Sequence, residues 1–404
     1  MRLERLTTLG VAAFPRFRTA MVFAGLAIVG AGVFVLLGST SRASFAALAG
    51  VVILSPLIAW SGPTRLGKGL CVAASLLLVF ALIDAEAALL LRPRITVDGR
   101  PASLIVPDPV LGYRPRPDSR ATLTLDRFGR RIYRATYGID ADGFRLTRSA
   151  AVGDADTTVF LGDSYTFGDA LNDPAALPQQ YADARGGRER VINAAFSGYG
   201  THQVLRLLQS GRLDRLLNGA PSGGRRAFVY PVIDEHLRRI EGRAPGDWLG
   251  SPHYELAAGS ARYVGRFYPG LAGAWAGMLS SSAVAIAIGN ALMIDPRPQS
   301  TELFGAMVQD AQRIARQRYR ADFRVLLWDE PMLLDRGAPD RARRRAALVD
   351  RIAAELIRRG VPFWRVSQLI PDYRAHLSDY VIAGNGHPSA KLNRRLAVEL
   401  ARRM

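Results

Sequence analysis

The sequence predicts an α/β protein with a mostly parallel sheet and helices on both faces, preceded by transmembrane helices. Long apolar runs fill residues 1–94, and short β-branched or aromatic runs alternate with helix-like segments over residues 156–404. Buried parallel strands are typically continuous apolar runs, and strands that alternate with helices are typical of a parallel α/β sheet. Functional residues of such sheets lie in loops at the carboxyl ends of the strands.

The chain is strongly basic, and arginine supplies nearly all of the positive charge. It has 404 residues and a formal net charge of +18, and Lys68 and Lys391 are its only lysines. Two explanations stay open: an anionic partner such as phospholipid or acidic polysaccharide, and an arginine-rich genome. The sequence contains no repeat of aromatic and basic residues of the kind that would indicate nucleic-acid binding. Cys71 is the only cysteine, which excludes an intrachain disulfide and a cysteine metal cluster. No cofactor or metal is expected.

Three apolar runs predict about three transmembrane helices. Each is long enough to cross ~30 Å of hydrocarbon. A cleaved signal peptide is the alternative for the first run, but further apolar runs follow it at once and favour a retained span. The runs are Thr19 to Ser41, Ala43 to Thr64 and Gly69 to Leu91.

The charges of the loops predict the orientation. The N-terminal segment carries four arginines before the first run, the loop between the second and third runs carries Arg65 and Lys68, and the loop between the first and second has only Arg42. The positive-inside rule then places the N-terminus in the cytoplasm. We expect a multi-pass protein of the inner membrane whose catalytic region faces the periplasm. A count of two spans would leave that region in the cytoplasm.

Two carboxylates, Asp84 and Glu86, interrupt the last third of the third run. They would lie near an interface, where charge costs less than at the bilayer midplane. Pairing with arginines and contact with substrate are the other roles considered.

Residues 95–155 predict a small β-rich connector. Five prolines exclude a long helix, and Ile132 to Ile139 alternates as a strand with one exposed face does. The stretch Asp140 to Gly143 is similar to the start of a calcium loop. Because the distal glutamate of that pattern is missing, a plain turn is favoured.

The stretch with the clearest chemistry is Leu161 to Gly168, which reads Leu-Gly-Asp-Ser-Tyr-Thr-Phe-Gly. A buried strand is predicted just before it at 157–161, followed by a turn at Gly162 and a helix. Ser164 would then lie at a strand-to-helix turn, beside backbone N–H groups that can stabilise an oxyanion. The alternative is a tight turn with an N-cap serine, since Gly-Asp-Ser is a common turn composition.

Two later stretches favour the catalytic interpretation. A strand at 191–193 runs into the Ser197-Gly198 turn, and Gly-His387-Pro precedes the last helix. Serine turn, glycine turn and histidine-proline, in this order, resemble the SGNH (GDSL-like) hydrolase family over about residues 155–404. The resemblance implies a flavodoxin-like α/β sandwich that cleaves or transfers acyl esters. It also implies Ser164 as nucleophile, His387 as base, and the N–H groups of Ser164 and Gly198 in the oxyanion hole.

The chain departs from the family pattern at two positions. The family usually orients its base with an aspartate two or three residues earlier, where this chain has Asn385. An amide oxygen can accept from the imidazole but carries no full charge, so we expect a Ser-His dyad supported by Asn385, or an orienting carboxylate from elsewhere. The family asparagine of the oxyanion hole is replaced by Asp234, which cannot donate when ionised. His236 or Arg239 replaces that donor, or the hole has only two members.

An insertion is expected at about 243–300. Its part at 267–294 carries no charge and is long enough for a fourth span. A span there would separate Ser164 from His387 across the membrane. We therefore interpret it as an inserted helix pair, either a lid or a surface lying on the bilayer. An ordinary buried helix is the alternative.

The sequence thus predicts a membrane-anchored ester hydrolase or O-acyltransferase that acts on acyl esters, acetyl esters foremost, of an envelope glycan or lipid. Three spans are few for a channel that carries acyl groups across a membrane, so a transferase would need a partner membrane acyltransferase as donor. The rival is a non-catalytic envelope protein of the same fold that binds glycan or lipid. Asp234 and Asn385 are the features that favour the rival.

Overall fold

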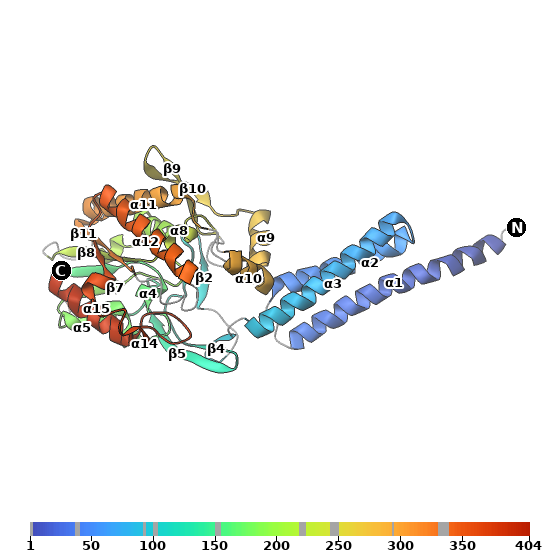
Figure 1. Cartoon of the computed structure of the whole chain (residues 1–404), viewed down its shortest axis with the longest axis horizontal. Helices are drawn as coiled ribbons and strands as arrows, with labels where there is room; N and C mark the ends of the chain where they lie inside the picture. The colour runs from blue at the N-terminus through green and yellow to red at the C-terminus, as the bar shows by residue number, and fades with distance from the viewer. Residues whose placement is uncertain are drawn as a thin grey trace. The chain divides into compact units, whose positions relative to one another are not determined.

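The computed structural model divides the chain into two compact units, which are described separately. The first comprises Met1–Pro93 and Gly270–Ile294, and the second Arg94–Pro269 and Asp295–Met404. Figure 1 shows the elements of both. The described residues are 3–36, 41–91, 94–99, 104–149, 155–217, 224–242, 250–292, 295–329 and 339–404. The start of the expected insertion, 243–249, lies outside them.

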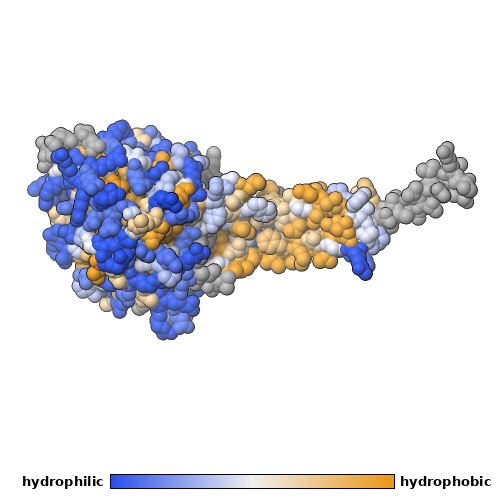
Figure 2. Space-filling model, turned by 90° about the horizontal axis from the view of Figure 1, so that it is seen from above, coloured by the Kyte–Doolittle hydropathy of each residue, from blue (hydrophilic) through white to orange (hydrophobic). Residues whose placement is uncertain are grey.

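Three long helices make up most of the first unit: α1 (Leu3–Leu36), α2 (Arg42–Ser61) and α3 (Arg65–Leu91). Each contains a stretch long and apolar enough to cross a membrane. Apolar residues also dominate the visible surface of these helices (Figure 2). Such a surface is unstable in water and suits lipid.

The apolar insert forms two short helices that belong to the first unit, α9 (Leu271–Ser280) and α10 (Ala283–Leu292). They are bent by 84° at the break between them. Each has 10 residues, so each is about 15 Å long. Taken together, the two helices pass the test of length and composition as one broken span or a re-entrant loop, so the described residues hold three helices that could cross a membrane, or four with this pair.

Asp84 joins the corner between α9 and α10 to α2 and α3. Its carboxylate is fully buried. It accepts hydrogen bonds from the Ser282 hydroxyl (2.6 Å), the Val284 N–H (3.0 Å) and the Ser44 hydroxyl (2.8 Å), and from the Ser41 hydroxyl. A buried carboxylate needs such donors, because burying an unpaired one costs several kcal/mol (about 20 in the ideal dry limit). The cluster therefore fixes the insert to the apolar helices.

The connector forms antiparallel strands at the start of the second unit. The long β4–β5 hairpin carries β1 on its outer edge, and β2 pairs with β3. Asp140 Oδ1 accepts from the N–H groups of Asp142 and Phe144, which makes the segment after β5 a plain turn. The strands are β1 (Arg94–Val97), β2 (Ile105–Asp108), β3 (Gly112–Pro115), β4 (Ser119–Arg127) and β5 (Arg130–Ile139).

Five parallel strands form the central sheet, in the spatial order β12-β11-β8-β6-β7. Counted along the chain from β6, this is the flavodoxin-like order 2-1-3-4-5, with its switch point between β6 and β8. The predicted fold class is confirmed. The strands are β6 (Thr157–Phe160), β7 (Arg190–Asn193), β8 (Arg226–Val232), β11 (Ala321–Leu327) and β12 (Phe363–Arg365).

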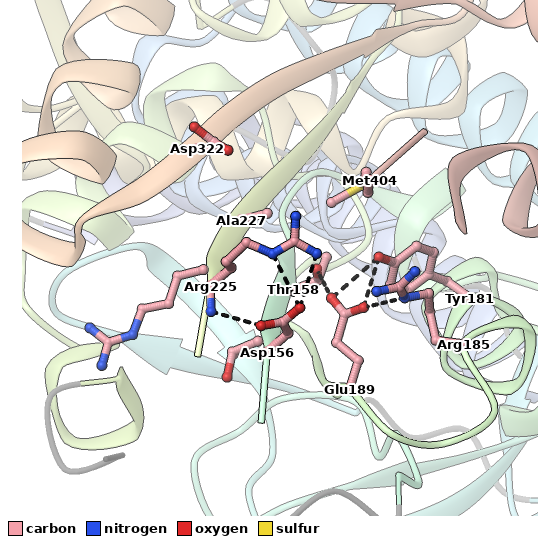
Figure 3. Close-up of a pocket in the computed structure, with 11 residues that line it drawn as sticks. Asp156, Thr158, Tyr181, Arg185, Glu189, Arg225, Ala227, Asp322 and Met404 are labelled. Carbon is pink, nitrogen blue, oxygen red and sulfur yellow. Dashed lines mark hydrogen bonds and ion pairs between the residues drawn. The ribbon is translucent and has the colours of Figure 1, made fainter. Parts of the chain in front are cut away.

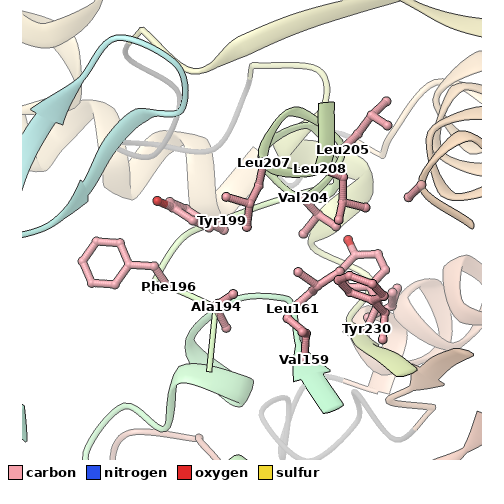
Figure 4. Packing of buried hydrophobic residues seen from close by; sticks show 14 of the residues in the cluster. Val159, Leu161, Ala194, Phe196, Tyr199, Val204, Leu205, Leu207, Leu208 and Tyr230 are labelled. Carbon is pink, nitrogen blue, oxygen red and sulfur yellow. The ribbon is translucent and has the colours of Figure 1, made fainter. Parts of the chain in front are cut away.

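Helices cover both faces of the sheet (Figure 1). Side chains alternate along β6, so Val159 and Leu161 enter one core and Phe160 the other. In the first core they lie near α6 and Tyr230 of β8 (Figure 4). The helices of this unit are α4 (Ser164–Phe167), η1 (Asp173–Ala175), α5 (Leu177–Ala184), α6 (Thr201–Gln209), α7 (Asp214–Leu217), α8 (His236–Arg239), α11 (Pro298–Tyr319), α12 (Pro339–Arg358), α13 (Val366–Leu369), α14 (Leu377–Tyr380) and α15 (Ala390–Arg403).

Two features differ from the expectation. The spacing of Val204, Leu207, Leu208 and Leu216 in the sequence predicts one helix over 201–217, but the helix breaks after α6, where Gly211 takes a φ of +73°, a value that ends a helix. A hairpin of β9 (Pro252–Ala257) and β10 (Ser260–Arg266) precedes the apolar insert. Its short strands were not predicted.

Candidate active site

Ser164 lies at a sharp turn between β6 and α4. Gly162 takes a φ of +122°, and a Cβ there would meet Thr166 Oγ1 at 2.8 Å and Pro231 O at 3.2 Å. Only glycine fits such a position, so the glycine brings the serine to the carboxyl end of the sheet. The Asp163 side chain caps α4 by accepting from the Tyr165 N–H at 3.0 Å. Ser164 is 7% exposed, so its hydroxyl sits in a largely dry but accessible position.

A chain of hydrogen bonds links Ser164, His387 and Asn385. His387 Nε2 lies 2.8 Å from Ser164 Oγ, and His387 Nδ1 lies 2.5 Å from Asn385 Oδ1. Because the amide oxygen can only accept, it selects the tautomer with the proton on Nδ1 and leaves Nε2 free to take the serine proton. The serine and the base are 223 residues apart in sequence. The structure brings together all three residues predicted from the motifs.

The loop that carries His387 is fixed on both sides. The Ile382 N–H donates to His387 O at 2.8 Å, and Val381 pairs with Pro388 in an antiparallel bridge. The Tyr165 ring lies 5.3 Å from the imidazole, centroid to centroid. These contacts hold the base above the serine, as a proton relay requires.

Two backbone N–H groups beside the serine have no partner. Among the described residues, no protein acceptor bonds to the N–H of Ser164 or of Gly198. Gly198 follows β7 and takes a φ of +81°. An oxyanion hole consists of such unpaired donors, and these two lie at the carboxyl end of the sheet.

Asp163 is a buried carboxylate directly under the catalytic turn. Arg239 Nη1 donates to Asp163 Oδ2 at 2.9 Å and to Tyr199 O at 2.7 Å, so one guanidinium links the serine turn to the glycine turn. Burial alone would raise the pKa of Asp163, but the contact with His236 and the charge of Arg239 hold it below its ordinary value of 3.8. The aspartate is therefore ionised.

His236 lies fully buried below the site. Its Nδ1 is 3.0 Å from the Tyr230 hydroxyl, and its Nε2 is 3.4 Å from Asp163 Oδ2. Burial lowers the pKa of this histidine despite the nearby Asp163 carboxylate. Within the described residues Nε2 has no hydrogen-bond partner, so the neutral ring packs against Asp163 without a hydrogen bond to it.

Asp234 follows β8, as expected, but it forms an ion pair. Arg345 of α12 donates from Nε to one carboxylate oxygen at 2.7 Å and from Nη2 to the other at 2.8 Å. Asp234 is 1% exposed. Such a two-pronged pair neutralises the aspartate and keeps both of its oxygens occupied. Sequence reasoning missed Arg345, which lies 111 residues away in a helix whose arginines look like a solvated face.

Arg145 is a second residue that the sequence did not indicate. Its side chain is fully buried. It donates to the carbonyls of Phe167 and Gly168 at 2.5 and 2.7 Å and to Leu171 O at 2.6 Å, and it pairs with Asp173. Arg145 thus holds the end of α4 and the following loop in place. Nothing in the local sequence marks it among the many arginines.

A pocket lies at the amino-terminal edge of the sheet, opposite the edge that carries Ser164 (Figure 3). Glu189 there accepts from Arg185 at 2.7 Å, and Arg225 pairs with Asp156. Within the described ranges, no group of three or more His, Cys, Asp or Glu side chains could hold a metal ion.

The fold and the site define a class: an α/β sandwich with a Ser-His-Asn relay at the carboxyl ends of its strands, the arrangement of a serine hydrolase. Three of the solved structures to which the chain is similar are as follows. One is a lipolytic protein of the G-D-S-L family from Desulfitobacterium hafniense, with 10% identity, coverage of 61% of this chain and 99% of that chain, and a TM-score of 0.36.

The second similar structure is TesA, with 15% identity, coverage of 61% and 96%, and a TM-score of 0.35. The third is a variant of an acetyl xylan esterase from Geobacillus stearothermophilus, with 12% identity, coverage of 62% and 95%, and a TM-score of 0.33. No protein-family model and no curated protein matches the chain. The case for a function therefore rests on the chain's own geometry.

Proposed function

We propose that the chain is a membrane-anchored SGNH-type ester hydrolase or O-acyltransferase. The observation that carries this proposal is the unbroken relay from Asn385 through His387 to Ser164, beside two unpaired N–H groups. A serine that only caps a turn does not require an imidazole 2.8 Å from its hydroxyl, whereas a nucleophilic serine requires such a base.

The chemistry follows from these positions. His387 Nε2 takes the proton of Ser164 Oγ as the oxygen attacks the acyl carbonyl carbon. The carbonyl electron pair moves onto its oxygen, which the N–H groups of Ser164 and Gly198 receive. Collapse breaks the bond to the alcohol, and the alcohol oxygen takes the proton from Nε2. The acyl group stays on Ser164. Water removes it in a hydrolase, and a sugar hydroxyl removes it in a transferase.

The two departures from the family pattern fit an active site. Asn385 is bonded to the imidazole at the position of the usual aspartate, and Asp234 is neutralised by Arg345. Neither therefore blocks the proton transfer. The features that favoured a non-catalytic binding protein have structural explanations, and the catalytic function is preferred.

We further propose that α1, α2 and α3 span the inner membrane, with the second unit in the periplasm. Their apolar stretches and the charges of the loops support this topology. Acyl esters of an envelope glycan or lipid, acetyl esters foremost, are the substrate class on that side. A transferase would take its acyl group from a partner membrane acyltransferase.

The test is acyl release by the full-length chain in detergent, with p-nitrophenyl acetate as substrate. Wild type and the exposed-serine control Ser260→Ala should release nitrophenol equally, and Ser164→Ala should not. Two further assays distinguish hydrolysis from transfer. With acetylated xylan the released acetate is measured, and with free xylan the acetyl groups transferred to the sugar are measured. Equal activity of Ser164→Ala and wild type would contradict the proposal.

A further inference from the structure

The connector contributes a tyrosine hydroxyl to the glycine turn of the proposed active site. Tyr113 of β3 donates from this hydroxyl to Ser197 O at 3.2 Å. Its ring also packs against the rings of Phe196 and Tyr199, with centroids 6.0 and 5.4 Å apart. A residue 84 positions earlier in the chain, from a strand outside the central sheet, thus lies against the turn that carries Gly198.

The carbonyl that Tyr113 bonds belongs to the same peptide unit as the proposed oxyanion donor. The peptide bond between Ser197 and Gly198 holds Ser197 O and the Gly198 N–H in one plane. Among the described residues every peptide bond is trans, and in a trans unit the C=O and the N–H point in opposite directions. A hydrogen bond that fixes the direction of this carbonyl therefore also fixes the direction of the N–H.

Residues 196–199 form a β-turn whose central peptide has two possible orientations. The Tyr199 N–H donates to Phe196 O at 3.0 Å, and Gly198 takes a φ of +81°. Both are features of a type II turn. A type I turn differs by a rotation of the central peptide of roughly 150–170°. Because glycine is allowed in both types, the residue itself does not keep its N–H in one direction.

Other contacts already hold the two ends of this turn. The Phe196 N–H donates to Gly162 O at 3.2 Å, and Arg239 Nη1 donates to Tyr199 O at 2.7 Å. Neither bond involves the central peptide, so neither determines its rotation. The bond from the Tyr113 hydroxyl is made to that peptide and favours one of its two orientations.

We propose that Tyr113 is a positioning residue of the oxyanion hole. Its hydroxyl holds the central peptide of the turn in the orientation that presents the Gly198 N–H to the oxyanion, and its bond to the carbonyl also polarises that N–H. Donors of an oxyanion hole act by being oriented before the reaction begins. The connector is thereby part of the active site. This inference rests on the proposed function and adds a residue to its site.

The test compares full-length Tyr113→Phe with wild type in the acetyl ester assay. Phenylalanine keeps the ring and its packing and removes only the hydroxyl. The value of kcat should fall by roughly three- to tenfold, the effect of one neutral hydrogen bond. KM should be nearly unchanged, because oxyanion donors act on the transition state. Tyr268→Phe is the matched control and should equal wild type, since the Tyr268 hydroxyl also donates to a carbonyl, Gly242 O, at 3.2 Å.

Inhibition by methylboronic acid separates positioning from a general structural role. Boronic acids form a tetrahedral adduct with a serine hydroxyl, and such an adduct resembles the transition state. The inhibition constant should therefore rise in Tyr113→Phe by the same factor by which kcat falls. An unchanged inhibition constant beside a lower kcat would assign Tyr113 to the fold of the connector and overturn the inference, as would a Tyr113→Phe variant as active as Tyr268→Phe. Equal activity of wild type and Ser164→Ala would overturn the proposed function itself, so the two failures are distinguishable.

Discussion

Arg239→Met is the substitution that tests the support under the catalytic turn. Methionine retains much of the length and apolar volume of arginine and removes the guanidinium. Arg239 is 11% exposed at its side chain and Asp163 1%. The variant therefore leaves a fully buried, ionised carboxylate without its closest cation.

The expected loss follows from that burial. Removing one partner of a buried ion pair costs about 3–5 kcal/mol, since the remaining charge is uncompensated. At about 2–4 °C per kcal/mol, the melting temperature of the second unit should fall on the order of 10 °C. The guanidinium also holds Tyr199 O, next to Gly198. Without the guanidinium, the turn that carries the Gly198 N–H is no longer held in place. Because this N–H is an oxyanion donor, kcat should fall on the order of a hundredfold.

The pH dependence gives an independent reading of the same pair. The pKa of Asp163 is held below its ordinary value of 3.8. Its stabilising contribution is thus fully present above pH 3.8 and is lost as the pH falls through the lower folded-state value. Without Arg239 the pKa of this buried carboxyl rises, and the acid-unfolding midpoint of the variant should move to higher pH.

The assay is thermal and acid unfolding of the full-length protein in detergent, followed by tryptophan fluorescence. Arg238→Met is the matched control on the same helix, because Arg238 pairs with the partly exposed Glu235. That variant should lose less than ~1 kcal/mol. If Arg239→Met and Arg238→Met unfold alike and are equally active, Asp163 does not depend on Arg239 and the reasoning is refuted.

Three further predictions concern the relay, the ion pair and the topology. Ser164→Ala should lower activity by roughly three or more orders of magnitude, and adding His387→Ala should cost little more, since the two act as a unit; additive losses would contradict this. Asp234→Asn removes the charge of Asp234 from its buried pair with Arg345 and should destabilise by about 3–5 kcal/mol without raising kcat; a folded, faster variant would instead put position 234 in the oxyanion hole. A reporter fused after Arg94 should be active as alkaline phosphatase and dark as green fluorescent protein, and the reverse pattern would remove one span.

The sheet and the relay could be predicted because their determinants are local. Runs such as 157–161 are apolar and β-branched, and glycines mark the turns that follow the strands. The order of the serine, glycine and histidine motifs then fixed which loops carry the site. The Ser164–His387 contact was expected from the resemblance of these motifs to the SGNH family, since His387 lies in a loop between α14 and α15 and not at the end of a strand.

The charged partners could not be predicted, because their pairing depends on packing between distant elements. The chain has 53 Lys and Arg residues, and no local pattern distinguishes the buried Arg145 and Arg345 from the exposed ones. Arg239 was named as a possible oxyanion donor, but its bonds to Asp163 and Tyr199 appear only when α8 is packed. The ion pair of Asp234 could not be foreseen either, because its partner Arg345 comes from a helix far along the chain.

The most direct test of the central claim is covalent labelling of the full-length protein with a serine-directed fluorophosphonate, located by peptide mass spectrometry. The account predicts that the label sits on Ser164. It also predicts that His387→Ala slows labelling by orders of magnitude, because no base removes the serine proton, and that Ser260→Ala labels as wild type does. A wild-type protein that takes no label at Ser164, or a His387→Ala variant that is labelled at the wild-type rate, would contradict the claim that these two residues form a catalytic relay.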